Sequence, residues 1–343
     1  MRVAIVTDHQ SRNADELSIA ESLRGAFAGQ IGPPEMADVV VSTSRVTARS
    51  VTVPFGVPHI CYLSHMDAQT DPTSVFSVES SQRLNPITLD VSAVSVAQTE
   101  TQATVGPSRL GVTHFLASNG IAAAQLRQAI DRPVKIIYPA VDTHLYRPQK
   151  LRRSEHYLTN VDAGNIASLE LASAASRIAG RQLVVVTESN FELPDLQAEQ
   201  PQLQFVTADD PSELYQLLSE CRALLCLSSE TFDTNVIRAQ ACGTPVIVPA
   251  SGGIAELVLD AEQEGPGTGL LFEPSTPDSI ASAMLELERR PQKCSAMLAS
   301  AHAQVFSPAR FAREIRAFTA AVVASAVRTA VEEPLGGEQR RAA

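Results

Sequence analysis

The stretch SSETFDTNVIRAQACGTPVIVPASGGIAE, residues 228–256, decides how the rest of the chain is interpreted. The apolar run that precedes it, residues 223–227, has the length of a strand. After a break, a short helix is expected over residues 235–241, with Thr234 as its N-cap. The stretch therefore begins as a strand, a turn and a helix.

The second part of the stretch repeats this order. Gly-Thr-Pro at 243–245 ends the first helix, residues 246–248 form a second apolar strand, and Gly252 and Gly253 lead into a helix over 254–259. Ligands of open α/β sheets bind beyond the carboxyl ends of the strands, where such turns lie. Free N–H groups at a helix N-terminus suit a diphosphate, and glycines let it approach the backbone. The spacing alone leaves open that both are ordinary βα turns without a ligand.

The composition limits the class of protein. A length of 343 residues predicts two domains, and 44% hydrophobic residues allow sizeable cores. A net charge of −11 with three lysines argues against nucleic-acid partners and against an anionic membrane surface. The sequence has no apolar run of 18 residues and starts as a strand, so neither a membrane-spanning segment nor a signal peptide is expected. The five cysteines lack a zinc spacing, which predicts free thiols in a reducing, cytoplasmic compartment.

Short apolar runs alternate with helical patterns along the whole chain. Strands are expected at 2–6, 39–41, 59–63, 113–117, 134–138, 156–161, 182–187, 204–207 and 269–272. Helices are expected at 14–28, 120–130, 167–178, 211–219, 277–288, 292–303 and 308–327. Residues 67–84 are expected to be loop, with a helix as the alternative, and the pattern of 88–105 fits strand and helix equally. This rhythm predicts an α/β fold with mostly parallel sheets.

The rhythm pauses once, which divides the chain. Residues 142–155 are polar and contain a proline and four basic residues, and they are expected to be a linker with a solvated basic face. We therefore expect an N-terminal domain over 1–145 and a C-terminal domain over 146–307. The tail, residues 331–343, is expected to be disordered.

Four quoted segments resemble one known family. ETFDTNVIRAQACGTPVIVPASGGIAELV (230–258) and GTGLLFEPSTPDSIASAML (267–285) resemble the C-terminal domain of family-4 retaining glycosyltransferases. VTHFLASNGIAAAQLRQAIDRPVKIIYPAVDTHLYRP (112–148) resembles the end of their N-terminal domain, and PHICYLSHM (58–66) is similar to the mannosyltransferase-like subgroup. The resemblance implies the GT-B fold, in which two Rossmann-like domains face a cleft, and a helix at 308–330 that returns to the N-terminal domain.

The resemblance also implies an activity. It implies transfer of a sugar from a nucleotide-diphosphate sugar to an unknown glycan or small-molecule acceptor, with retention of configuration and without a metal or other cofactor. The implied catalytic residues are Glu230 and His65. The implied donor-binding residues are Phe232, Asp233, Thr234, Arg238, Gly252, Gly253 and Glu256.

Several functional positions depart from the family pattern. Asp233 stands where the family has a glycine, and Arg238 where it has a second glutamate. The Arg and Lys that neutralise the donor diphosphate align with Asp162 and Ala167, and a common His of the subgroup aligns with Ser64. The loss of one protein group that stabilises charge in the transition state lowers the rate by a factor on the order of 10²–10³.

One basic residue remains to compensate for these losses. Arg238 is the only basic residue of the central stretch, so its guanidinium is expected to reach Glu230 and the Gly252-Gly253 turn and to bind phosphate. The alternative is that Arg238 pairs with a carboxylate and only fills the vacated site.

The remaining candidates keep structural alternatives. Glu256 is also explained as an early-helix carboxylate, and His65 as a structural residue at a strand end. Asp8 and His9 end the first strand, where turn residues are common. The runner-up function is a non-catalytic glycosyltransferase-like subunit that partners an active enzyme or forms a homodimer. A sugar-nucleotide epimerase is a third alternative, but its carboxylates are not identifiable.

Overall fold

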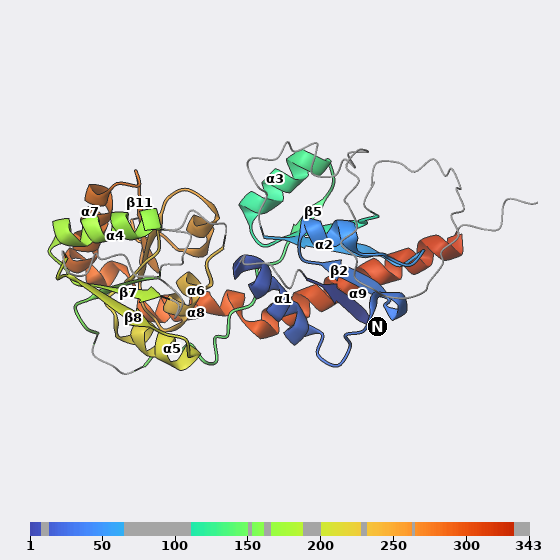
Figure 1. Ribbon diagram of the computed structural model, residues 1–343, viewed down its shortest axis with the longest axis horizontal. Helices are drawn as coiled ribbons and strands as arrows, with labels where there is room; N and C mark the ends of the chain where they lie inside the picture. Colours follow the sequence, from blue (N-terminus) through green and yellow to red (C-terminus); the bar gives the residue numbers. More distant parts are fainter. Residues whose placement is uncertain are drawn as a thin grey trace, which may run out of the picture.

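The protein contains two separate parallel sheets, which lie at the two sides of the ribbon in Figure 1. The computed structural model describes residues 1–7, 14–64, 111–149, 153–160, 166–187, 200–227, 232–262 and 265–332. We call the elements around the first sheet the N-terminal half and those around the second sheet the C-terminal half. This arrangement is the predicted α/β architecture. The predicted domain limits themselves stay a prediction.

The N-terminal half is built from short buried strands. They pair in parallel in the order β1 (Val3–Val6), β2 (Val39–Ser42), β3 (His59–Leu63), β4 (His114–Ala117) and β5 (Val134–Ile136). Its helical elements are α1 (Ala14–Ala26), η1 (Pro34–Met36), α2 (Arg45–Ser50) and α3 (Gly120–Ile130). Near-continuous apolar runs are typical of parallel strands covered on both faces, which is why these strands were predictable from the sequence.

The C-terminal half has a sheet whose strand order reverses. Its order is β11 (Gly269–Phe272), β10 (Val246–Pro249), β9 (Leu224–Leu225), β6 (Tyr157–Asn160), β7 (Leu183–Thr187) and β8 (Leu203–Thr207), all parallel. Its helices are α4 (Ile166–Ala179), α5 (Pro211–Glu220), α6 (Thr234–Ala241), α7 (Pro277–Arg289) and α8 (Ala296–Ala303). Its shorter 3₁₀ turns are η2 (Gly253–Leu257), η3 (Pro291–Lys293) and η4 (Gln304–Phe306).

One expected helix starts later in the structure, and one helix of the structure was not expected. The helix expected at 292–303 starts only at Ala296, because Pro291–Lys293 forms a separate 3₁₀ turn and Ser295 caps the new helix through its side chain. Helix α2 lies in a stretch for which no element was predicted. Ser44 and Thr47 form a reciprocal capping box there, which a search for apolar periodicity does not detect.

The linker contains a partly buried arginine, which corrects one expectation. Arg153 is part of the basic cluster expected to be solvated, but its guanidinium donates to the carbonyls of Cys221 and Gly243 and to Thr244 Oγ1. These carbonyls follow the C-terminal ends of α5 and α6, where a cation is favoured by the helix dipoles. Burial lowers the pKa of Arg153 below its usual value. Arg153 therefore fastens the linker to the C-terminal half.

The last helix runs along the N-terminal half. Helix α9 (Pro308–Glu332) packs against α1, and Phe311 stacks on Tyr62 of β3 with ring centroids 6.5 Å apart. Figure 1 shows this helix, in red, beneath the first sheet. Arg316 Nε donates to the carbonyl of Ala26 at 2.7 Å, which ties the helix to the end of α1. The residues from 333 onward lie outside the described part of the chain.

The cysteines are free thiols, as the sequence predicted. Four of them are buried and Cys294 is partly exposed. Burial raises the pKa of Cys221 to about 12 and that of Cys242 to about 11. These two thiols are therefore protonated at neutral pH and unreactive as nucleophiles.

Candidate functional site

The topology of the C-terminal sheet marks a place for a ligand. The strand order reverses between β6 and β9, and open α/β sheets bind ligands beyond the carboxyl ends of the strands at such a switch point. Asn160 ends β6, and its Oδ1 is buried with no hydrogen-bond partner among the residues that the structure describes. A buried acceptor without a donor is suited to a ligand hydroxyl. The sequence analysis missed Asn160, because it belongs to no motif.

The N-terminus of α6, close to the switch point, carries a carboxylate of its own. Asp233 Oδ1 accepts from the backbone N–H of Asn235 at 2.7 Å, and its Oδ2 accepts from the Cys226 thiol at 3.0 Å. Asp233 is thus the N-cap, and the prediction of Thr234 as the N-cap is wrong. A carboxylate caps as well as a hydroxyl and adds a negative charge that the helix dipole favours.

Phe232 and Thr234 flank this cap. The Phe232 side chain is 1% exposed and packs on Phe306 with ring centroids 6.1 Å apart. A side chain so buried fills the core, so only the backbone of Phe232 is left to contact a donor. Thr234 is the first residue of α6 and is partly exposed. The donor roles of both residues stay predictions.

Arg238 lies one turn further along α6. Its Nη1 donates to Asn235 Oδ1 at 2.9 Å, and its guanidinium carbon lies 5.3 Å from the centroid of the Tyr146 ring. Tyr146 belongs to the linker, so Arg238 makes a cation–π contact with the segment that joins the two halves. The alternative was a pairing of Arg238 with Glu230 or another carboxylate, and Glu230 lies outside the described residues.

The turn after β10 is built differently from the turn before α6. Gly252 has φ 91° and ψ 173°, a conformation that L-residues rarely adopt, and η2 follows it without a side-chain cap. The helix expected over 254–259 is the 3₁₀ turn η2. Because the N-cap residue Gly252 has no side chain, no side chain at that position accepts from the first N–H groups of η2.

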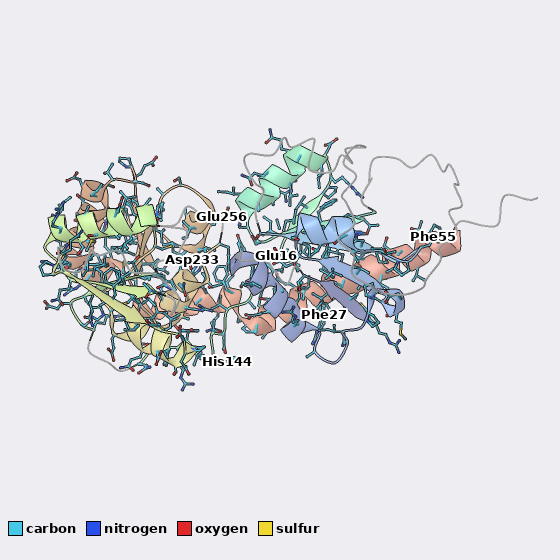
Figure 2. The ribbon with its side chains drawn as sticks, viewed as in Figure 1. Glu16, Phe27, Phe55, His144, Asp233 and Glu256 are labelled. Carbon is cyan, nitrogen blue, oxygen red and sulfur yellow. The ribbon has the colours of Figure 1, made fainter. Side chains whose placement is uncertain are left out.

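Glu256 extends from η2 to the N-terminal half. Its Oε2 accepts from the Gly120 N–H at 2.9 Å and from the Tyr138 hydroxyl at 3.2 Å, and its Oε1 accepts from the Ile121 N–H at 3.1 Å. Burial, followed by the charge of Glu256, raises the pKa of Tyr138 above its ordinary value. Figure 2 shows Glu256 and Asp233 on the side of the C-terminal half that faces the N-terminal half.

A buried carboxylate faces them from the N-terminal half. Glu16 of α1 is 8% exposed, and its Oε1 accepts from Thr43 Oγ1 at 3.0 Å, just beyond the end of β2. Figure 2 places Glu16 on the side of its half that faces Asp233. The sequence analysis did not identify Glu16, because the apolar period of α1 identifies the buried face of the helix and not its polar contacts.

The predicted catalytic residues Glu230 and His65 lie outside the described residues, as do the candidates Asp8 and His9. Asp162, which aligns with the Arg of the family pattern, lies outside them too. Ala167 is an exposed residue near the start of α4, and Ser64 is buried and accepts a hydrogen bond from Ser118 through its carbonyl. Across the described ranges, helices that combine the length and the apolar character needed to span a membrane are absent.

Comparison with protein families gives a match within the C-terminal half. Residues 172–304 match the family described as Glycosyl transferases group 1. This range contains α6, β10 and the Gly252-Gly253 turn. It covers less than half of the chain.

Two curated relatives share parts of the sequence. The D-inositol 3-phosphate glycosyltransferase of Mycobacteroides abscessus is 29% identical over 198 residues, which are 51% of this chain and 43% of the relative. The GDP-mannose-dependent monoacylated alpha-(1-6)-phosphatidylinositol monomannoside mannosyltransferase of Corynebacterium glutamicum is 41% identical over 69 residues, 20% of this chain and 16% of the relative. The chain thus aligns with less than half the length of these curated relatives.

The fold is shared over nearly the whole chain. The structure of Anabaena Alr3699/HepE in complex with UDP-glucose superposes with a TM-score of 0.66 at 14% identity, covering 94% of this chain and 100% of that one. An identity this low supports a conclusion about the fold alone. Residues 172–304 therefore match the group 1 glycosyl transferases, and the chain as a whole has the GT-B fold.

Proposed function

We propose that this chain is a glycosyltransferase that takes a sugar from a nucleotide-diphosphate sugar and transfers it to a glycan or small-molecule acceptor. The observation that carries the proposal is the family match of residues 172–304. This range includes the turn before α6 and the turn before η2, which follow β9 and β10 near the switch point of the C-terminal sheet. Retention of configuration and independence of metals and other cofactors belong to the proposal.

The donor would be held by the C-terminal half. The uncapped turn at Gly252 and Gly253 offers backbone N–H groups to the diphosphate, and the buried Oδ1 of Asn160 is an acceptor for a donor hydroxyl. Asp233 brings a carboxylate next to the sugar position and disfavours a further negative charge there. The donor therefore places its phosphates at the turn after β10 and not at the N-terminus of α6.

Arg238 has two competing roles, which one variant distinguishes. As a donor residue it would leave Tyr146 to reach phosphate, because a guanidinium fork matches phosphate oxygens. As a structural residue it would stay on the Tyr146 ring. Arg238→Ala abolishes nucleotide-diphosphate binding at an unchanged melting temperature in the first case. It lowers the melting temperature with unchanged binding in the second.

The acceptor would be held by the N-terminal half. Glu16 is the buried carboxylate of that half that faces the donor side, and carboxylates accept hydrogen bonds from sugar hydroxyls. His65 and Glu230 keep their proposed catalytic roles. D-inositol 3-phosphate, the compound in the name of the Mycobacteroides abscessus relative, is the first acceptor to test.

A second candidate function is a non-catalytic glycosyltransferase-like subunit that works with a partner enzyme or as a homodimer. The observation that favours it is the Asp233 carboxylate at the N-terminus of α6, since it disfavours an anion at that helix. For both candidates we propose the cytoplasm as the location, because five free thiols are typical of a reducing compartment.

Calorimetric titration with UDP, GDP and ADP tests both candidates. The glycosyltransferase is expected to bind at least one of them, and the matching nucleotide sugar is then incubated with D-inositol 3-phosphate and a panel of glycans. A product heavier by one sugar residue in mass spectrometry supports the enzyme. Wild-type protein that binds none of the three nucleotides contradicts it and supports the non-catalytic subunit.

A further inference from the structure

One carboxylate joins the two halves of the molecule. Glu256, on η2 of the C-terminal half, accepts three hydrogen bonds, and all three donors belong to the N-terminal half. Two of the donors are the first N–H groups of α3, Gly120 and Ile121, and the third is the Tyr138 hydroxyl. The helix that Glu256 caps is thus not part of its own half.

The cap is complete and matches the charge of the helix. Asn119 Oδ1 accepts from the Ala122 N–H at 2.8 Å, so the first three N–H groups of α3 all have partners once Glu256 is in place. A negative charge is stabilised at a helix N-terminus by the aligned peptide dipoles. Withdrawal of Glu256 would leave two of the three N–H groups without their acceptor.

The absence of a side chain at Gly120 makes this approach possible. A Cβ built at this position would lie 2.8 Å from Glu256 Oε1 and 3.0 Å from Oε2, closer than van der Waals contact allows. The clashing atoms are the far end of a flexible side chain, so an alanine would displace the carboxylate and leave the backbone in place. Gly120 is therefore a matched position from which to break the contact without touching Glu256.

The contact also reaches the segments that connect the halves. Tyr138 follows β5, and its carbonyl accepts from Arg310 Nη2 at 2.8 Å, near the start of α9. The Tyr138 ring packs on Phe306 of η4, with ring centroids 5.3 Å apart. The chain passes between the halves after β5 and again before α9, and Tyr138, whose hydroxyl donates to Glu256, contacts both connecting segments.

We propose that Glu256 is a positioning residue whose carboxylate, by capping α3, fixes the Gly252-Gly253 turn against the N-terminal half. Gly253 of the turn that we propose to hold the donor is the first residue of η2, three residues before Glu256, and Gly252 precedes it as the N-cap. The cap of α3 therefore sets the distance between this turn and the N-terminal half. This inference rests on the proposed function for its catalytic meaning, and it rests on the contacts alone for its structural meaning.

Amide hydrogen exchange tests the structural part without any assay of activity. In Glu256→Ala the Gly120 and Ile121 amides are expected to exchange on the order of tenfold faster than in the wild type, as hydrogen bonds to a charged group are lost. The Ala122 amide should keep its rate, because Asn119 still caps it. Unchanged rates at Gly120 and Ile121 overturn the proposal. Equal acceleration of all three amides, which means that α3 has unfolded, overturns it as well.

Gly120→Ala and Glu213→Gln complete the set of variants. Gly120→Ala should accelerate exchange at Ile121 and keep the melting temperature, since alanine favours the helix. Glu213 is an exposed carboxylate in the first turn of α5, within the C-terminal half. Glu213→Gln is the control and should leave the exchange rates of the Gly120 and Ile121 amides unchanged. Slow Ile121 exchange in Gly120→Ala would mean that the carboxylate is not needed there.

Transfer kinetics test the positioning part. Glu256→Ala is expected to lower kcat about tenfold with little change in the donor KM, and Glu256→Gln, which keeps one acceptor oxygen, should recover part of the loss. An unchanged kcat in Glu256→Ala overturns the positioning role. If the wild type transfers no sugar, the proposed function fails, while the exchange rates at Gly120 and Ile121 still decide whether the cap exists.

Discussion

Two neighbouring turns of the C-terminal half treat negative charge in opposite ways. The turn after β9 ends in Asp233, whose carboxylate already occupies the N-terminus of α6. The turn after β10 ends in Gly252, which presents η2 without a side-chain cap. Glu256, which follows in η2, directs its charge to α3 of the other half. The two turns have the same strand-to-helix order in sequence and opposite electrostatics in space.

The difference teaches where an anion can bind in this protein. Backbone N–H groups attract a phosphate only when they are not satisfied from within the chain. At α6 the chain supplies the anion itself, and at the Gly252 turn it does not. The first turn is therefore suited to recognition of neutral hydroxyls and the second to recognition of phosphate.

The largest expected effect is a loss of stability in acid, and it arises in the N-terminal half, away from the two turns. His59 is fully buried beside Ser42, and burial lowers its pKa to about 4. The unfolded chain takes up a proton at this residue below pH 6.5 and the folded chain does not, so stability is lost as the pH falls from 6.5 to 4. The loss is ~1.4 kcal/mol per pH unit, up to about 3 kcal/mol in total.

Urea unfolding of wild type and His59→Gln at pH 7, 5.5 and 4.5 measures this loss. The difference between the two unfolding free energies should change with pH, because other histidines titrate equally in both proteins. Glu288 behaves differently, since its hydrogen bond with Arg181 lowers its pKa and its contribution disappears only at lower pH. A constant difference between the two proteins would contradict the assignment to His59.

A substitution at the open turn is expected to have the next largest effect. Gly252→Ala forces a β-carbon into a backbone with φ 91°, which costs about 1–3 kcal/mol of unfolding free energy. We expect nucleotide-diphosphate binding to be lost with it, as measured by calorimetry. Ser251→Ala, at the exposed preceding residue, is the control and should retain both stability and binding. Full binding by Gly252→Ala would exclude this turn as the phosphate site.

Substitutions at the capped turn separate the cap from the charge. Asparagine caps as well as aspartate, so Asp233→Asn should keep the stability, whereas Asp233→Ala should lose about 1 kcal/mol. Removal of the charge is worth about 0.3–1 kcal/mol to an anion nearby, so Asp233→Asn should bind the nucleotide diphosphate about two- to fivefold more tightly. Weaker binding by Asp233→Asn would mean that the carboxylate itself holds the donor.

Much of the fold was predictable because its signals are local. The strand His59–Leu63 and the helix Gly120–Ile130 have the predicted bounds, since an apolar run or a periodic pattern between turn residues defines them. Helix α2 was missed because it has only six residues and its start is defined by hydrogen bonds between Ser44 and Thr47, which apolar periodicity does not reveal. The Asp233 cap was missed because two adjacent residues, Asp233 and Thr234, are both good caps.

Less of the site was predictable, because its contacts span the chain. Glu256 was selected as a donor residue from its place after two glycines, but its partners Gly120 and Ile121 lie 136 and 135 positions earlier. A pattern within one turn carries no information about a partner in another half. Asn160 and Glu16 show the same limit, because only the strand order and the burial reveal them.

The path of α9 has a consequence for how this protein is made. The core of the N-terminal half includes Phe311, Ile315 and Val322, which belong to α9, at the end of the described part of the chain. The ribosome synthesises the strands of the first sheet long before it synthesises α9. The face of β3 that carries Tyr62 therefore lacks its contact with Phe311 until the C-terminal half has been made. The half that is synthesised first is thus the half that finishes folding last.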